Sequence, residues 1–183
     1  MAAPVVGIVM GSDSDLEVME ACVDALAEFE IGCEVRVLSA HRTPDEALEW
    51  ARTAADRGLH VLVAGAGMAA HLPGVVAAVT SLPVIGVPIG ASKLDGMDAL
   101  LAIAQMPPGV PVATVAVDGA RNAGLLAVRI LAAANPDLRA RVDAFRTTQA
   151  EKVRDKDARV RERFDHRRQG GVDFGFGGAN RPG

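Results

Sequence analysis

Residues 4–26 read PVVGIVMGSDSDLEVMEACVDAL, and they contain the two elements from which most of the chain is built. Residues 4–10 form a short apolar run rich in Val, which is typical of a buried strand. Gly11 ends that run. From Leu16 to Leu26, apolar residues recur at spacings of three and four, which indicates an amphipathic helix. A buried strand followed directly by a helix predicts an α/β protein.

The same alternation continues through most of the chain. Apolar segments predict four further strands, over 33–38, 60–65, 83–88 and 111–117. Helices are expected over 44–57, over 97–106 and over 119–134. A further helix is expected after the third strand, and it should end at about Thr80. Because the strands are almost continuously apolar, both faces of their sheet must be covered. The sequence therefore predicts a three-layer α/β/α sandwich around a central parallel sheet, with right-handed crossovers.

The composition argues against several kinds of partner. A net charge of -4 and an aromatic content of 3% do not favour a nucleic-acid surface built on base stacking. Cys22 and Cys33 lack the spacing of a metal site or a disulfide framework. The apolar N-terminal run is too short to cross a membrane and lacks the basic segment of a signal peptide. We therefore expect a soluble cytoplasmic protein without a metal, nucleic-acid or membrane partner.

Chemistry is expected in the loops that follow the strands, because open parallel sheets bind ligands at the carboxyl ends of their strands. The first such loop is GSDSD, residues 11–15. Its Ser12 and Ser14 stand at a helix N-terminus, where free backbone N–H groups favour an anion. A plain N-cap is the alternative interpretation. The loop has neither the Gly-Lys-Ser/Thr ending of a P-loop nor the glycine pattern of a dinucleotide site.

The second loop is SAHRTP, residues 39–44, with Pro44 at the expected start of a helix. The planar guanidinium of Arg42 suits a bidentate contact with a phosphate. His41 carries the side chain whose unperturbed pKa lies nearest neutrality, as an acid/base group requires. A single loop histidine is more often merely exposed or capping. At this point the catalytic and the structural interpretations of His41 both stay open.

The third loop, AGAGMAAHLPG over 64–74, has small side chains that let backbone approach a ligand and keep a pocket dry. Its His71 has a catalytic, a structural and a subunit-contact interpretation, of which we favour a supporting role. The fourth loop, PIGASKLDG over 88–96, offers Lys93, although such a lysine is usually a plain surface residue. These loops together predict a site for a phosphorylated small molecule, with a histidine acid/base in a small dry pocket.

Five motifs occur in an order and spacing that resemble one known family, and they are GSDSD, SAHRTP, AGAGMAAHLPG, LPVIGVP and AQMPPGVPVAT. The chain resembles the N5-carboxyaminoimidazole ribonucleotide mutases, the bacterial type of class I phosphoribosylaminoimidazole carboxylase catalytic subunit. The resemblance covers about residues 4–150 and implies a flavodoxin-like fold and a homo-octamer.

The resemblance also implies roles for individual residues. Ser12, Asp15 and Arg42 match substrate-binding positions of the family, and His41 matches its acid/base histidine. The serine and the arginine would hold the 5′-phosphate of the substrate. Asp15 suits the ribose hydroxyls better, because a carboxylate repels a phosphate. Weaker matches in the same loops are Ser14, Ser39, Ala66, Gly67 and Lys93.

The implied reaction moves a carboxyl group from the exocyclic nitrogen of the substrate to ring carbon 4, a step of de novo purine (IMP) biosynthesis. It needs neither ATP nor another cofactor. Direct carboxylation of aminoimidazole ribonucleotide or another nucleotide is one alternative, and a non-catalytic nucleotide-binding module is another. The animal-type carboxylases tend to carry Lys-Gly in place of Arg42-Thr43 and a different loop in place of AGMAAH, residues 66–71. Both differences favour the mutase.

The domain organisation follows from the extent of the resemblance. We expect a catalytic α/β domain over 1–150, a charged helical extension over 151–168 and a disordered tail over 169–183. Acidic and basic residues are interleaved in the extension, which favours a solvated helix over a nucleic-acid arm. Within the shared region, Asp118 stands where the family usually has glycine and where some members have extra residues. We expect this departure to affect a turn or subunit packing.

Overall fold

The computed structural model describes residues 3–168 and confirms the alternation of strands and helices. Five strands follow one another along the chain, and they are β1 (Val6–Met10), β2 (Cys33–Val37), β3 (Val61–Gly67), β4 (Val84–Ile89) and β5 (Ala113–Thr114). The helices between and after them are η1 (Asp13–Asp15), α1 (Leu16–Ala27), α2 (Pro44–Arg52), α3 (Leu72–Ala77), α4 (Met97–Ala104), α5 (Ala120–Ala132) and α6 (Pro136–Arg168).

The strands form one parallel sheet in the order β2-β1-β3-β4-β5. This is the flavodoxin-like order, so the predicted fold is confirmed. The chain moves from β1 outward to β2 and then returns to β3 on the other side of β1. The strand order therefore reverses between β1 and β3, and the loops after these two strands diverge at the carboxyl edge of the sheet. That edge is where this fold binds ligands.

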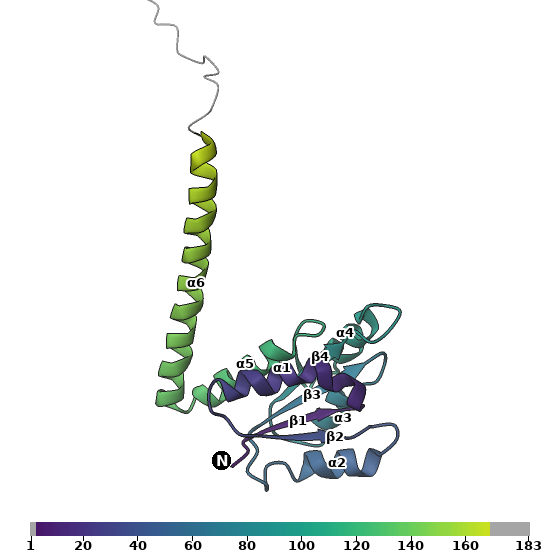
Figure 1. Cartoon of the computed structure of the whole chain (residues 1–183). Helices are drawn as coiled ribbons and strands as arrows, with labels where there is room; N and C mark the ends of the chain where they lie inside the picture. Colours follow the sequence, from purple (N-terminus) through teal and green to yellow (C-terminus); the bar gives the residue numbers. More distant parts are fainter. Residues whose placement is uncertain (1–2, 169–183) are drawn as a thin grey trace, which may run out of the picture. The chain divides into compact units, whose positions relative to one another are not determined.

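Helices cover both faces of the sheet. In Figure 1, α1 and α5 lie along the upper side of the sheet and α2 along its lower side. Gly65 of β3 lies so close to Met19 of α1 that a Cβ there would be 2.7 Å from the methionine sulfur. On the other face, a Cβ at Gly7 of β1 would be 2.8 Å from the Trp50 ring of α2. Glycine in these strands thus lets the helices pack directly on the sheet.

Three elements differ from their expected form. β2 is an edge strand, and Val35 and Val37 on it are 40% and 52% exposed, whereas the apolar pattern predicted a strand covered on both faces. β5 pairs with β4 only over Ala113–Thr114, although the apolar run is longer. Helix α2 ends at Arg52 instead of near residue 57, and turns continue the chain to Gly58, whose φ is 87°.

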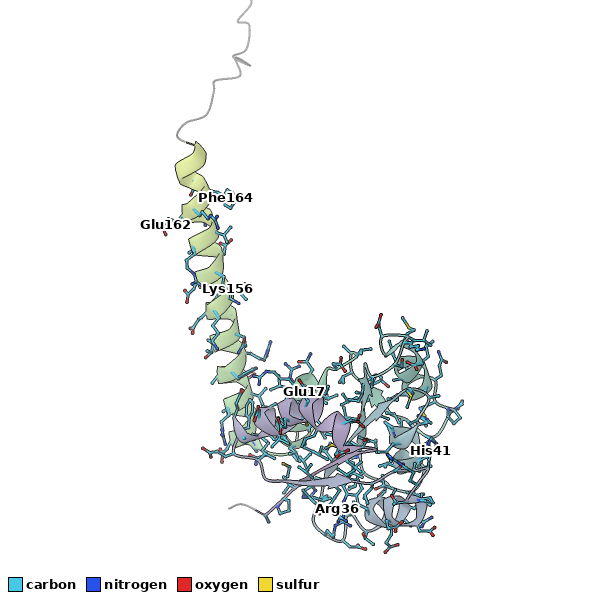
Figure 2. All side chains as sticks on the ribbon, turned by 45° about the vertical axis from the view of Figure 1, so that its right-hand side comes forward. Glu17, Arg36, His41, Lys156, Glu162 and Phe164 are labelled. Atoms are coloured by element: carbon cyan, nitrogen blue, oxygen red, sulfur yellow. The ribbon has the colours of Figure 1, made fainter. Side chains whose placement is uncertain are left out.

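Contacts divide the chain into two units after Val142. Helix α6 begins in the first unit and continues through the second, and its side chains from Arg146 to Asp165 are exposed and mostly charged. Figure 2 labels Lys156, Glu162 and Phe164 on this helix. No helix within residues 3–168 is both long and apolar enough to span a membrane. The expected disordered tail, 169–183, lies outside the described residues, and the expected domain boundary near residue 150 stays a prediction.

Candidate active site

A cavity of about 420 Å³ opens at the carboxyl edge of the sheet, beside the point where the strand order reverses. The loops after β1, β2 and β3 form most of its wall, and Ala91 adds to it from the loop after β4. Eight of the residues predicted from the sequence line this one cavity, and they are Ser12, Ser14, Asp15, Ser39, His41, Arg42, Ala66 and Gly67. In Figure 2, His41 lies at the right-hand edge of the α/β unit, apart from Arg36 on β2.

The loop after β1 caps the short helix that follows it and also lines the cavity. The Oγ of Ser12 accepts a hydrogen bond of 3.4 Å from the backbone N–H of Ser14, so Ser12 caps the short helix η1. The N-cap interpretation is therefore correct for Ser12. Both serines nevertheless line the cavity, and the hydroxyl of Ser14 donates a bond of 3.4 Å to Asp15.

Asp15 is the buried charged residue of this site, with 6% of its surface exposed. Burial raises the pKa of its carboxyl group above the ordinary value, and hydrogen bonds from Ser14 and Ser12 together with the charge of Arg42 oppose that shift. A buried carboxylate lowers the stability of the protein unless a bound ligand donates hydrogen bonds to it. Asp15 is therefore placed to accept hydrogen bonds from the hydroxyl groups of a bound molecule.

The loop after β2 is tied to the loop after β1 through Arg42. Its Nη2 donates a hydrogen bond of 2.6 Å to the carbonyl oxygen of Gly11, and its Nε donates one of 3.3 Å to Ser39 Oγ. The backbone N–H of Arg42 also donates to Ser39 Oγ, at 3.2 Å. His41, next to it, is exposed and lines the cavity. A fixed cation and a solvent-accessible imidazole thus share one wall.

The end of β3 and the loop after it supply a wall of small apolar groups. Ala66 and Gly67, the last two residues of β3, line the cavity together with Ala70, as the glycine and alanine content predicts. Met68 lines it as well, with a φ of 56° and 59% of its surface exposed. The sequence did not indicate Met68 or Leu72, the first residue of α3, as lining residues, because an apolar side chain gives no signal of its own for a ligand site.

His71 does not line the cavity, although its neighbours Ala70 and Leu72 do. Its Nε2 lies 2.9 Å from the sulfur of Met106, and its buried Nδ1 has no hydrogen-bond partner among the described residues. Burial lowers the pKa of His71. An imidazole packed against Met106 suits the supporting role expected from the sequence, which stays a prediction.

Lys93 is the predicted binding residue that the structure leaves outside the cavity lining. It is exposed in the turn between β4 and α4, whose only lining residue is Ala91. Asp118, where the resemblance implies a departure from the family pattern, has a φ of 55°. This is a conformation that glycine adopts more easily, and the expected effect of the departure on the turn or on subunit packing stays a prediction.

Comparison with known proteins identifies the family. A model of the AIR carboxylase family matches residues 5–152. The chain belongs to this family. A protein of Mycobacterium tuberculosis named N5-carboxyaminoimidazole ribonucleotide mutase is 63% identical over 157 residues, which are 86% of this chain and 90% of that protein. The family match ends within α6.

Two further members show the breadth of the family. A Schizosaccharomyces pombe protein named phosphoribosylaminoimidazole carboxylase is 57% identical over 154 residues, which are 84% of this chain but 28% of that longer protein. The crystal structure of Treponema denticola PurE superposes with a TM-score of 0.77 at 28% identity, and the match covers 86% of this chain and 98% of that one. The fold, the motifs and the family thus agree.

A metal site has no support in the described part of the chain. No group of three or more His, Cys, Asp or Glu side chains there is arranged to hold a metal ion. The polar groups of the cavity are instead hydroxyls, one carboxylate, one guanidinium and one imidazole. These groups can bind a phosphate and a sugar and can move a proton.

Proposed function

We propose that this chain converts N5-carboxyaminoimidazole ribonucleotide to 4-carboxy-5-aminoimidazole ribonucleotide, with His41 as the acid and the base. The enzyme is an isomerase of purine biosynthesis, like its relative that is 63% identical. The observation that carries the proposal is that His41, Arg42, Ser12 and Asp15 line one cavity at the reversal point of the sheet. Groups that bind an anion, a carboxylate that accepts hydrogen bonds from hydroxyl groups, and a titratable imidazole therefore lie within reach of one small ligand.

Substrate binding follows from the charges of the two polar loops. Arg42 and Ser12 hold the 5′-phosphate, because a guanidinium and a hydroxyl side by side can both donate hydrogen bonds to an anion. Asp15 accepts hydrogen bonds from the ribose hydroxyls, and these bonds offset the cost of its burial. Ser14 and Ser39 support the two charged residues, since each is bonded to one of them. The base then lies toward His41 and the small-residue wall.

Catalysis needs one proton to move twice. His41 first donates a proton to the exocyclic nitrogen, the bond from that nitrogen to the carboxyl carbon breaks, and carbon dioxide is released. Ring carbon 4 then attacks the carbon dioxide and forms the new carbon–carbon bond. His41 finally removes the proton from carbon 4, which restores the aromatic ring and the starting state of the histidine. The sum is an isomerisation with no net proton or electron change.

The small-residue wall has a part in this scheme. Ala66, Gly67 and Ala70 have no polar side chain that would hold a water molecule beside the released carbon dioxide. Confinement of the gas beside these residues, next to carbon 4, makes the second step effectively unimolecular. The Gly/Ala loop is thus a catalytic feature as well as a packing feature.

Direct carboxylation of aminoimidazole ribonucleotide is the second candidate, because a 57% identical relative is named as a carboxylase. The discriminating experiment gives purified enzyme either the N5-carboxy nucleotide or aminoimidazole ribonucleotide with bicarbonate at its physiological concentration. We expect rapid formation of the 4-carboxy product from the first substrate and very little from the second. Efficient use of the second substrate mixture would refute the mutase assignment.

We also propose that copies of the chain associate, as the octamer expected from the family resemblance requires. The exposed valines of β2, Val35 and Val37, support association, because an apolar sheet edge is normally covered. Light scattering on the purified protein measures the mass directly, and a monomer at micromolar concentration would contradict the proposal. The cytoplasmic location belongs to the same set of proposals, and cell fractionation tests it.

A further inference from the structure

Asp118 lies in the loop between β5 and α5 and adopts a conformation that most side chains avoid. Its φ of 55° is in the left-handed region, where aspartate, asparagine and glycine are the residues most often found. A non-glycine residue there is held by its surroundings. Its hydrogen bonds therefore show what holds it.

Two hydrogen bonds join Asp118 to the end of β4. Its backbone N–H donates to the carbonyl oxygen of Pro88 at 2.8 Å. Its Oδ1 accepts from the backbone N–H of Gly90, also at 2.8 Å. In a regular parallel sheet, a residue makes both of these bonds with its backbone. Its N–H donates to the residue before the one it faces, and its carbonyl oxygen accepts from the residue after that one. The carboxylate of Asp118 thus replaces a strand carbonyl opposite Ile89.

This pairing continues the sheet where β5 has already ended. The ladder between β4 and β5 covers only Ala113–Thr114, and Val115 adds one bond to Gly86. On the β3 side, Ile89 pairs with Gly67. On the other side of β4, the two bonds of Asp118 supply the partners of the Pro88 carbonyl and of the Gly90 N–H. Asp118 therefore closes the second side of β4 at the edge of the sheet that carries the cavity.

The segment that Asp118 holds is part of the cavity wall. Ala91 follows Gly90 directly and is the residue through which the loop after β4 reaches the cavity. A Cβ built on Gly67 would lie 3.4 Å from the Cβ of Ala91, so the two residues are close neighbours in the wall. The carboxylate also packs on Gly90, since a Cβ there would be 2.8 Å from its Oδ2. Moving Gly90 would therefore change the spacing between Ala91 and Gly67.

We propose that Asp118 is a positioning residue that keeps the small-residue wall closed by holding Gly90 and Ala91 against Gly67. The consequence for the reaction rests on the proposed function, in which this wall confines carbon dioxide. Asp118 touches neither the substrate nor the reacting atoms. Loss of its bond to Gly90 lets carbon dioxide escape before carbon 4 attacks it, so that aminoimidazole ribonucleotide leaves the enzyme as a product.

The test compares three variants at this one position, Asp118→Gly, Asp118→Ala and Asp118→Asn. Glycine favours the left-handed φ but has no acceptor, alanine has neither advantage, and asparagine keeps both the φ and an acceptor oxygen. The assay follows N5-carboxyaminoimidazole ribonucleotide and measures the ratio of aminoimidazole ribonucleotide to 4-carboxy product, after subtraction of the spontaneous decarboxylation in a blank. We expect the ratio to rise about tenfold in the glycine and alanine variants and to stay near the wild-type value in the asparagine variant.

The matched control is Asp95→Gly. Asp95 also has a positive φ, 49°, and lies in the exposed turn between β4 and α4, but no hydrogen bond to its carboxylate occurs among the described residues. We expect a wild-type ratio for this control. An unchanged ratio in Asp118→Gly, an equal rise in the asparagine variant, or an equal rise in Asp95→Gly would each overturn the proposal.

A second readout does not depend on the reaction. Hydrogen exchange of the peptide around Gly90, followed by mass spectrometry, should become faster in Asp118→Gly and stay slow in Asp118→Asn. Unchanged exchange in the glycine variant would refute the positioning role by itself. Wild-type enzyme that forms no 4-carboxy product would refute the proposed function instead, and the exchange result would still decide the role of Asp118.

Discussion

The Nη2 of Arg42 donates a hydrogen bond of 2.6 Å to the carbonyl oxygen of Gly11, across 31 residues of sequence. This bond joins the loop after β2 to the loop after β1, the two polar walls of the cavity. The same guanidinium also donates to Ser39, which fixes its plane. Arg42 thus orders the cavity before a ligand arrives, and its remaining N–H groups are available for a phosphate.

Replacement of Arg42 by lysine tests this arrangement. Arg42→Lys keeps the positive charge but loses the fork that can bind Gly11, Ser39 and a phosphate at once. We expect KM for the N5-carboxy nucleotide to rise roughly tenfold to a hundredfold, with a smaller change in kcat, because binding is weakened more than the chemical step. Steady-state kinetics measures both constants.

Arg36→Lys is the control for that variant. Arg36 is likewise exposed and lies on β2, but it does not line the cavity. Its replacement should leave KM unchanged. Equal KM values for the Arg42 variant and the wild-type enzyme would show that the phosphate is held elsewhere.

The buried carboxyl group of Asp15 predicts a conflict between function and stability. Because burial raises its pKa in the folded protein, the proton stabilises the folded state below the unfolded pKa, about 4, and this stabilisation is lost as the pH rises through the folded pKa. At neutral pH, Asp15 is therefore a cost. We expect Asp15→Asn to raise the free energy of unfolding by about 1 kcal/mol at neutral pH and to weaken substrate binding.

The pH dependence separates this cause from a packing effect. Below about pH 4 the wild-type carboxyl group is protonated in both states, so the gain from Asp15→Asn should disappear. Thermal denaturation at several pH values measures it. Asp13→Asn, an exposed change in the same loop, is the comparison and should have little effect on stability. A gain from Asp15→Asn that is independent of pH would contradict the electrostatic explanation.

The packing of His71 on Gly74 gives a further prediction. A Cβ on Gly74 would overlap the imidazole of His71, which is itself held against Met106. Gly74→Ala should therefore destabilise the protein by about 1–3 kcal/mol. In a His71→Ala background the same change should cost much less, because the overlapping ring is gone. Equal costs in both backgrounds, measured by chemical denaturation, would show that the ring does not set the spacing.

Much of the fold followed from local patterns in the sequence. Pro44 begins α2 as expected, and the five apolar runs all became strands of one parallel sheet. The exposure of Val35 and Val37 could not be predicted, because an edge strand and a central strand have the same apolar pattern. The short pairing of β5 could not be predicted either, because the apolar run over 111–117 does not show where the ladder with β4 ends.

The site was predictable to a similar degree and for a similar reason. Loops that follow neighbouring strands converge at one edge, so the positions of His41, Arg42 and Asp15 at one cavity followed from the strand pattern. The contact between His71 and Met106 spans 35 residues and leaves no local signal. Lys93 was placed at the site by its loop alone, and the turn instead leaves it outside the cavity lining.

The most direct test of the account is the turnover of N5-carboxyaminoimidazole ribonucleotide by His41→Asn. Asparagine preserves hydrogen bonding but cannot carry a proton between nitrogen and carbon 4 at neutral pH. We predict that the variant folds, binds the substrate with a KM similar to that of the wild-type enzyme, and loses kcat by at least about a hundredfold. Full turnover by His41→Asn would contradict the account, because the proton would then have to move through another group.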